Sequence, residues 1–113
     1  MNVTTTRVGT VMVLRVQEPR LTYPILADFA TVAADLITAG EKQIVVDLTP
    51  VSYVDSATIG CLMDLYRQVS SAGGHLKLSS VQRRVETMLT MTGAQHFIEI
   101  HPDEATAVKS FKV

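Results

Sequence analysis

The chain has 113 residues, of which 47% are hydrophobic and 19% are charged, and its formal net charge at pH 7 is −1. This length fits one domain over residues 1–113, whose core needs neither disulfides nor a structural metal, and the composition excludes a disordered chain. The near-neutral net charge does not indicate electrostatic binding to nucleic acid or to an anionic membrane surface. The single cysteine excludes an internal disulfide. No segment reads as a leader or approaches the ~20 apolar residues of a membrane span, so we expect a cytoplasmic protein.

The first half of the chain predicts a hairpin, a helix and a buried strand, in that order. Runs rich in β-branched residues at 3–8 and 11–16 flank Gly9-Thr10, which is typical of a tight turn between paired strands. Apolar residues then recur at helical spacing over 23–40, ending at a glycine. The aliphatic run over 44–48 indicates a buried strand.

Helical and strand patterns continue to alternate in the second half. The predicted elements are a helix over 56–72 ended by Gly73-Gly74, a strand over 75–79, a helix through 85–91 ended by Gly93, a short strand over 97–100 and a terminal helix over 103–111. We expect Met88 and Met91 in the core. Strands that alternate with helices indicate βαβ units. The predicted fold is therefore α/β, with a small, mostly parallel sheet flanked by helices and an antiparallel edge from the opening hairpin.

The five residues 54–58, Val-Asp-Ser-Ala-Thr, connect the strand side of the fold to the helix over 56–72. Ser56 lies at the start of that helix, where free N–H groups and the helix dipole favour negative charge. Its hydroxyl can therefore act as a helix cap, worth about 1 kcal/mol, or carry a phosphate group. The residues alone leave both interpretations open, and Asp55 is an alternative cap.

One side of the same helix is predicted to be small and polar. At about 100° per residue, Gly60, Asp64 and Arg67 fall on the side of Ser56, and Ala57 beside it adds little bulk. The opposite side carries the apolar residues Leu62, Tyr66 and Val69. We expect Cys61, near the edge of that apolar stripe, to serve packing.

The segment 46–60, VDLTPVSYVDSATIG, resembles the signature region of STAS domains, in particular the bacterial anti-sigma factor antagonists. The likeness continues through 72–78 and 85–93. The resemblance implies a switch protein in which the serine directly after the loop aspartate is phosphorylated by a partner that is both a serine kinase of the ATPase fold and an anti-sigma factor. The unphosphorylated form would bind that partner and free the sigma factor, and a PP2C-type phosphatase would reset the cycle. Ser56 matches the phosphoacceptor and Asp55 the aspartate.

The resemblance also implies a partner-binding surface and two departures from the family pattern. The expected partner-binding residues are Asp55, Ser56, Ala57, Thr58, Gly60, Asp64 and Arg67. Thr58 stands where the family usually has glycine, so its side chain could restrict the approach of a kinase or offer a second phosphate acceptor. The region 17–21 lacks the aspartate of the Gly-Glu-Leu-Asp type motif that helps partner recognition in many relatives.

Two other classes of function are alternatives. The first is a scaffold or adaptor subunit, in a stressosome-like signalling assembly or a lipid-transport complex, which would not need a modifiable serine. The second is an enzyme, for which the sequence offers no nucleophile–base pair, no paired carboxylates and no metal set on one loop. His75, His96 and His101 are too widely spaced for a metal-ligand pattern. We therefore expect no catalytic residue, no cofactor and no metal.

Overall fold

An antiparallel hairpin opens the chain in the computed structural model, which describes residues 2–111. Strands β1 (Val3–Val8) and β2 (Val11–Val16) have the predicted bounds. The turn between them places Gly9 at φ +63°, a conformation that glycine adopts without steric cost. A two-residue turn with glycine in its first position has a backbone twist that matches the twist of the paired strands. This turn therefore fixes the register of the hairpin.

The hairpin belongs to a five-stranded sheet with the order β1-β2-β4-β6-β7. Strands β4 (Gln43–Asp47), β6 (His75–Ser79) and β7 (Ile100–His101) run parallel to β2 and to one another. The predicted α/β class and mostly parallel sheet with an antiparallel edge are confirmed. Each parallel crossover carries a helix, which is the usual connection between parallel strands.

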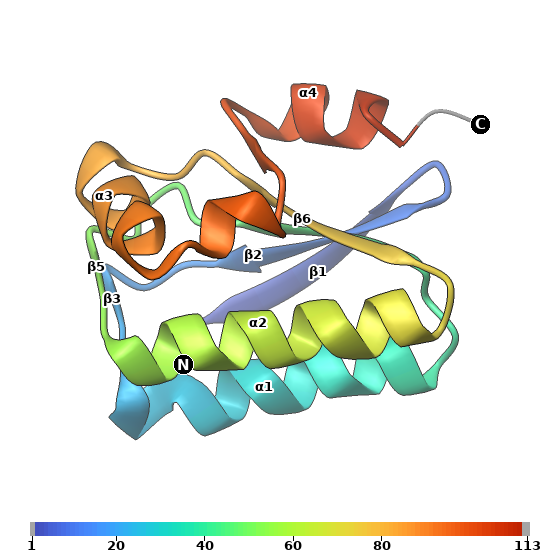
Figure 1. Cartoon of the computed structure of the whole chain (residues 1–113). Coiled ribbons are helices and arrows are strands. Elements are labelled where there is room, and N and C mark those ends of the chain that lie inside the picture. Colours follow the sequence, from blue (N-terminus) through green and yellow to red (C-terminus); the bar gives the residue numbers. More distant parts are fainter. Residues whose placement is uncertain (1, 112–113) are drawn as a thin grey trace.

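The two faces of the sheet are covered unequally (Figure 1). Helices α1 (Tyr23–Thr38) and α2 (Ser56–Ser71) lie side by side on one face, and α3 (Arg83–Thr92) completes the larger core there. Helix α4 (Glu104–Lys109) lies on the other face over a smaller apolar cluster. No helix in residues 2–111 is long and apolar enough to cross a membrane.

Strand alternation explains how both cores arise from the same strands. In β2, Leu14 belongs to the larger core and Val13 to the smaller one; in β4, Val46 and Val45 divide in the same way. Successive side chains of a strand point to opposite faces. A continuous run of apolar residues therefore indicates a strand that is buried on both sides.

Two short strands were not predicted. β3 (Arg20–Leu21) and β5 (Tyr53–Val54) form a separate two-stranded parallel sheet beside the N-termini of α1 and α2. Two residues are too few to show any periodicity, which explains why the sequence gives no signal for them.

The predictions near the C-terminal end of α3 were partly wrong. A 3-10 helix, η1 (Ala94–His96), follows α3, and the last strand starts at Ile100 instead of residue 97. Met88 packs against the core as expected, but Met91 is 81% exposed. Ile98 is buried without belonging to a strand. An apolar run of this length cannot distinguish a strand from an irregular buried segment.

Candidate functional site

The β3–β5 pair brings the N-termini of α1 and α2 to one carboxylate, that of Asp55. Leu21 pairs with Val54, and the chain continues from these residues into α1 and α2 respectively. Oδ1 of Asp55 accepts a hydrogen bond from the backbone N–H of Thr58 at 2.9 Å, and Oδ2 accepts one from the N–H of Tyr23 at 2.8 Å. Asp55 therefore caps two helices, which satisfies one otherwise unpaired N–H group at each N-terminus.

The electrostatic surroundings of Asp55 keep this carboxylate ionised. Partial burial opposes ionisation, but the hydrogen bonds from Tyr23 and Thr58 outweigh it and lower the pKa of Asp55 below its ordinary value. Two helix N-termini directed at one group also favour a negative charge there. The result is a fixed negative charge immediately before Ser56.

Ser56 is the first residue of α2 and is exposed. The N-cap is Asp55, so the alternative that Ser56 serves as the helix cap is wrong. Within residues 2–111 the Ser56 hydroxyl has no hydrogen-bond partner among the side-chain bonds of the structure. The hydroxyl is therefore accessible and is not needed to hold the helix end.

The structure places four of the other expected site residues on the same exposed side of α2. Ala57, Gly60, Asp64 and Arg67 are all exposed, and a Cβ built on Gly60 would meet nothing within 4 Å. Arg67 Nη1 pairs with Asp64 Oδ1 at 2.9 Å, so these two charges largely compensate each other. This side of α2, residues 56, 57, 60, 64 and 67, is called the Ser56 face below.

Thr58 differs from the expectation because its side chain points into the protein. The residue is fully buried, with a relative exposure of 0%. Its Oγ1 lies 2.7 Å from the carbonyl oxygen of Leu21 and 2.8 Å from Oδ1 of Asp55, and its single hydrogen can serve one of these acceptors at a time. In this conformation Thr58 can neither contact a partner nor accept phosphate. The residue ties α2 to β3.

Tyr23 and Arg20 are close to the candidate site but were not identified from the sequence. Tyr23, whose N–H binds Asp55, is 74% exposed, and the guanidinium of Arg20 lies 4.5 Å from the ring centroid of Tyr53. The β3–β5 pairing places Arg20 beside Tyr53, two residues before Asp55, and Tyr23 begins α1 two residues after the end of β3. An exposed aromatic residue at the predicted helix start was the available signal, but nothing in the sequence indicated the strand pairing.

A shallow, mostly apolar groove runs between α1 and α2 beside this site. It is lined by Tyr23, Pro24, Leu26, Ala27, Ala30 and Cys61. Cys61 is half-buried there, and burial raises the pKa of its thiol, which agrees with a packing role. A neighbouring depression, which includes Ala57, Gly60 and Asp64, connects this groove to the Ser56 face.

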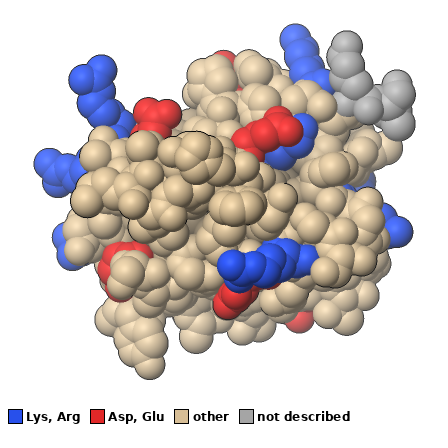
Figure 2. Space-filling model, viewed as in Figure 1, with Lys and Arg blue, Asp and Glu red and all other residues tan. Residues whose placement is uncertain are grey.

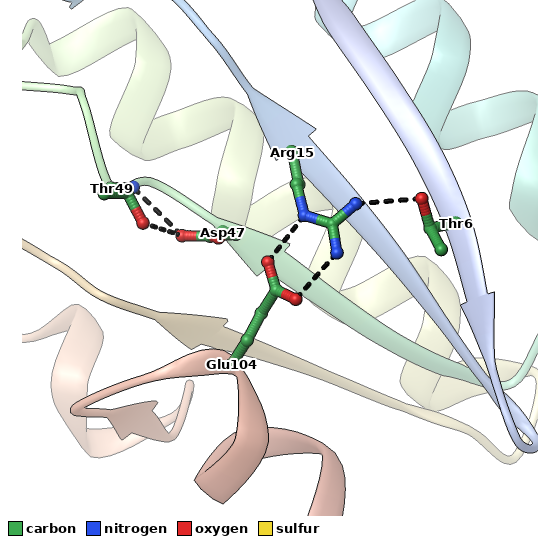
Figure 3. A network of polar contacts seen from close by, with 5 residues as sticks. All are labelled: Thr6, Arg15, Asp47, Thr49 and Glu104. Atoms are coloured by element: carbon green, nitrogen blue, oxygen red, sulfur yellow. Dashed lines mark hydrogen bonds and ion pairs between the residues drawn. The ribbon is translucent and has the colours of Figure 1, made fainter.

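The other face of the sheet carries a separate polar cluster (Figure 3). Arg15 on β2 forms two parallel bonds with Glu104 on α4, at 2.7 and 2.8 Å, and a third bond at 2.8 Å with Thr6. Buried Asp47 accepts two bonds from Thr49. These groups attach α4 to the sheet, and none of them lies on the Ser56 face.

Two of the three histidines are surface residues. His75 and His96 are exposed, and half-buried His101 contacts Glu99 at 3.0 Å. Among residues 2–111 there is no group of three or more His, Cys, Asp or Glu side chains that could hold a metal ion. Figure 2 shows that charged side chains on this view of the molecule occur in small groups separated by wide uncharged surface.

A comparison with protein families assigns the chain to a class. The STAS domain model matches residues 2–107 of the chain. The chain therefore belongs to the STAS domain family, as the resemblance of its signature segment predicted.

Individual relatives point in the same direction. A protein of Thermotoga neapolitana, provisionally named an anti-sigma factor antagonist, is 28% identical over 75 residues, which is 66% of this chain and 66% of that protein. The match thus spans just under two-thirds of the relative's length. The crystal structure of a protein of Thermotoga maritima with the same provisional name superposes with a TM-score of 0.87 at 23% identity, covering 96% of this chain and 92% of that one.

The structural likeness extends to a protein solved in two states of phosphorylation. The phosphorylated Bacillus cell fate determinant SpoIIAA superposes with a TM-score of 0.76 at 15% identity, covering 98% of this chain and 100% of that one. The unphosphorylated anti-sigma factor antagonist SpoIIAA gives 0.81 at 16% identity, covering 96% and 95%. At this level of identity the comparison establishes a shared fold.

Proposed function

We propose that the protein is an anti-sigma factor antagonist, a binding module that is switched by phosphorylation of Ser56. In its unphosphorylated form it would bind an anti-sigma factor of the ATPase fold that also acts as its serine kinase. A PP2C-type phosphatase would restore the binding form. The observation that carries this proposal is the exposed Ser56 hydroxyl, which does not cap the helix and lies beside the small residues Ala57 and Gly60.

The shape of the Ser56 face suits close contact with a protein partner. Ala57 and Gly60 leave little side-chain volume around the hydroxyl, and Gly60 faces open space. Tyr23 offers an exposed aromatic ring at the adjoining end of the groove. Aromatic side chains that fill a partner's pocket supply a large share of binding energy in many interfaces. The Ser56 face and the adjoining groove therefore combine small residues around the hydroxyl with one candidate anchor.

The charges around Ser56 explain how a phosphate would release the partner. Phosphorylation adds about −1.5 to −2 charges. Asp55 beside it is already ionised, and Arg67, the one cation of the Ser56 face, is paired with Asp64, while the guanidinium of Arg20 lies over the ring of Tyr53. Burying an uncompensated charge at an interface costs several times the ~1.4 kcal/mol that changes affinity tenfold. Release follows without any change of fold.

The phosphorylated chain should remain folded, because a phosphate at the first residue of a helix lies where the dipole favours negative charge. Asp55, which holds both helix ends, is not displaced by adding a group to the exposed Ser56 hydroxyl. The proposed switch is thus a property of the binding surface and leaves the core unchanged.

The first test compares Ser56→Ala and Ser56→Asp as immobilised baits in lysate of the native cells. We expect wild type and Ser56→Ala to capture an ATPase-fold anti-sigma factor, and Ser56→Asp to bind it at least tenfold more weakly. Ser70→Asp is the matched control, because Ser70 is exposed near the other end of the same helix. Equal capture by Ser56→Ala and Ser56→Asp would contradict the switch.

Peptide mapping of the chain purified from its native cells completes the test. One phosphate on Ser56, removed by phosphatase treatment, is the expected result. A chain that stays unmodified under growth and stress conditions would instead favour the constitutive scaffold or adaptor.

A further inference from the structure

Strand β1 forms a long, open edge of the main sheet. It is the first strand in the order β1-β2-β4-β6-β7, and within residues 2–111 its outer side pairs with no other strand. All of its residues after Val3 are exposed. The opposite edge of the sheet is β7, which has two residues. A row of unpaired backbone N–H and C=O groups is a template for pairing with another strand.

The hairpin register identifies which backbone groups point outward. Val8 and Val11 flank the two-residue turn, and such flanking residues exchange backbone hydrogen bonds. At the other end, the N–H of Gln17 donates to the carbonyl of Asn2 at 2.8 Å. Alternate residues of β1, beginning with Asn2 and ending with Val8, therefore bond to β2. The N–H and C=O groups of the intervening residues, Val3, Thr5 and Arg7, point away from β2 into solvent.

Most of the usual protections of an exposed edge are absent from β1. Its sequence, VTTTRV, has no proline or lysine, and its register with β2 is continuous without a bulge. Its one charged residue, Arg7, is paired with Glu41 of the same chain. Threonine and valine both have high β-propensity. The edge is therefore suited to pairing, and one internal ion pair reduces its charge.

We propose that this edge is a dimerisation surface on which β1 of a second copy of the chain pairs antiparallel, with the two-fold axis at Thr5. In this register Thr5 pairs with Thr5 of the other copy, and Val3 pairs with Arg7. These are the outward-pointing residues, and each pair exchanges backbone hydrogen bonds. The two sheets join into one continuous sheet.

The side chains are compatible with this register. Arg7 lies opposite a valine and not opposite the other Arg7, so no like charges face each other. Thr4 lies opposite Thr6 of the second copy, a cross-strand pair that contributes favourably in sheets. Registers shifted by two residues leave part of the outward-facing set unpaired, which favours the two-fold axis at Thr5.

The pairing is expected to depend on protein concentration. A single six-residue edge buries far less than the roughly 1,200–2,000 Å² of a stable, standard-size interface. We therefore expect a dimer in reversible exchange with monomer, and no dependence on the state of Ser56. Failure of this proposal would leave the proposed phosphorylation switch unaffected, and failure of the switch would leave the edge pairing intact.

The test uses charge at the two-fold axis. Thr5→Lys and Thr5→Glu each place two like charges directly opposite each other in the dimer, while the exposed side chain leaves the monomer unchanged. Sedimentation equilibrium of the full chain from about 10 μM to about 1 mM should show a dimer for wild type and at least tenfold weaker association for each variant. An equimolar mixture of the two variants should restore the dimer, because opposite charges then face each other.

Thr90→Lys, at an exposed threonine on α3, is the control and should dimerise like wild type. Circular dichroism and thermal melting confirm that each variant is folded. A wild type that stays monomeric at about 1 mM overturns the proposal. Variants that dimerise as well as wild type, or a mixture that fails to restore the dimer, also overturn it.

Discussion

Thr58 stabilises the site through a hydroxyl group that solvent does not reach. The hydroxyl lies within hydrogen-bond distance of the Leu21 carbonyl, and the residue is fully buried. Thr58→Val keeps the side-chain shape but leaves that carbonyl without its partner, which should cost about 1–3 kcal/mol in the free energy of unfolding. Thr58→Ser keeps the hydroxyl and should lose less. Urea unfolding measures both, and a valine variant as stable as the serine variant would contradict the assigned bond.

The same residue shows what the sequence can and cannot reveal about the site. The exposed side of α2 that includes Ser56, Gly60 and Arg67 was predictable, because the helical repeat alone places these residues together. The inward orientation of Thr58 was not, because it depends on a carbonyl 37 residues away in a strand that has no pattern of its own. Burial of a polar residue follows from its partners, which a local pattern does not contain.

At the scale of the element, α4 is attached to the sheet largely by an ion pair. The two-bond contact between Arg15 and Glu104 joins it to the sheet, and the apolar cluster beneath it is small (Figure 3). The hydrogen bonds from Arg15 lower the pKa of Glu104, so its stabilising effect is present at neutral pH and is lost as the pH falls through that lowered pKa. Asp47 behaves in the opposite way, because burial, followed by the nearby Glu104, raises its pKa.

These directions give opposite predictions for two neutral substitutions. Glu104→Gln should destabilise the protein at pH 7 by about 1 kcal/mol, and the difference from wild type should disappear in acid. Asp47→Asn should slightly stabilise it at pH 7, since the amide oxygen can still accept the bonds from Thr49 and the cost of a buried charge is removed. That gain should shrink as the pH falls through the raised pKa of Asp47. Chemical unfolding at several pH values tests both, and a shared sign at pH 7 would contradict the argument.

Most elements could be predicted because each has a period or an end signal of its own. The hairpin strands and β6 have the predicted bounds, and α2 ends one residue before its predicted end. Predictions failed where an element is held by its neighbours instead. The short strands β3 and β5 form only through their pairing and were missed, and the last strand was predicted with the wrong bounds because the apolar run before β7 reads equally well as a strand.

At the scale of the whole molecule, the unequal cores predict unequal local stability. The larger core joins the central strands to α1, α2 and α3, whereas α4 rests on a few apolar residues and its polar contacts. Native-state hydrogen exchange should therefore be slowest for amides of β4 and β6 and faster for α4 than for α2. Glu104→Gln should speed exchange in α4 alone. Uniform exchange across all helices would indicate that α4 unfolds only with the rest of the chain.

The carboxylate shared between two helices also affects cooperativity. Asp55 accepts one bond from the start of α1 and another from the start of α2, and the Thr58 hydroxyl of α2 lies 2.7 Å from the Leu21 carbonyl just before α1, so polar contacts join the two helix ends. The two ends are therefore expected to order, and to fray, as a single unit. The Ser56 face adjoins this unit, so a partner bound there would hold together two segments that lie far apart along the chain.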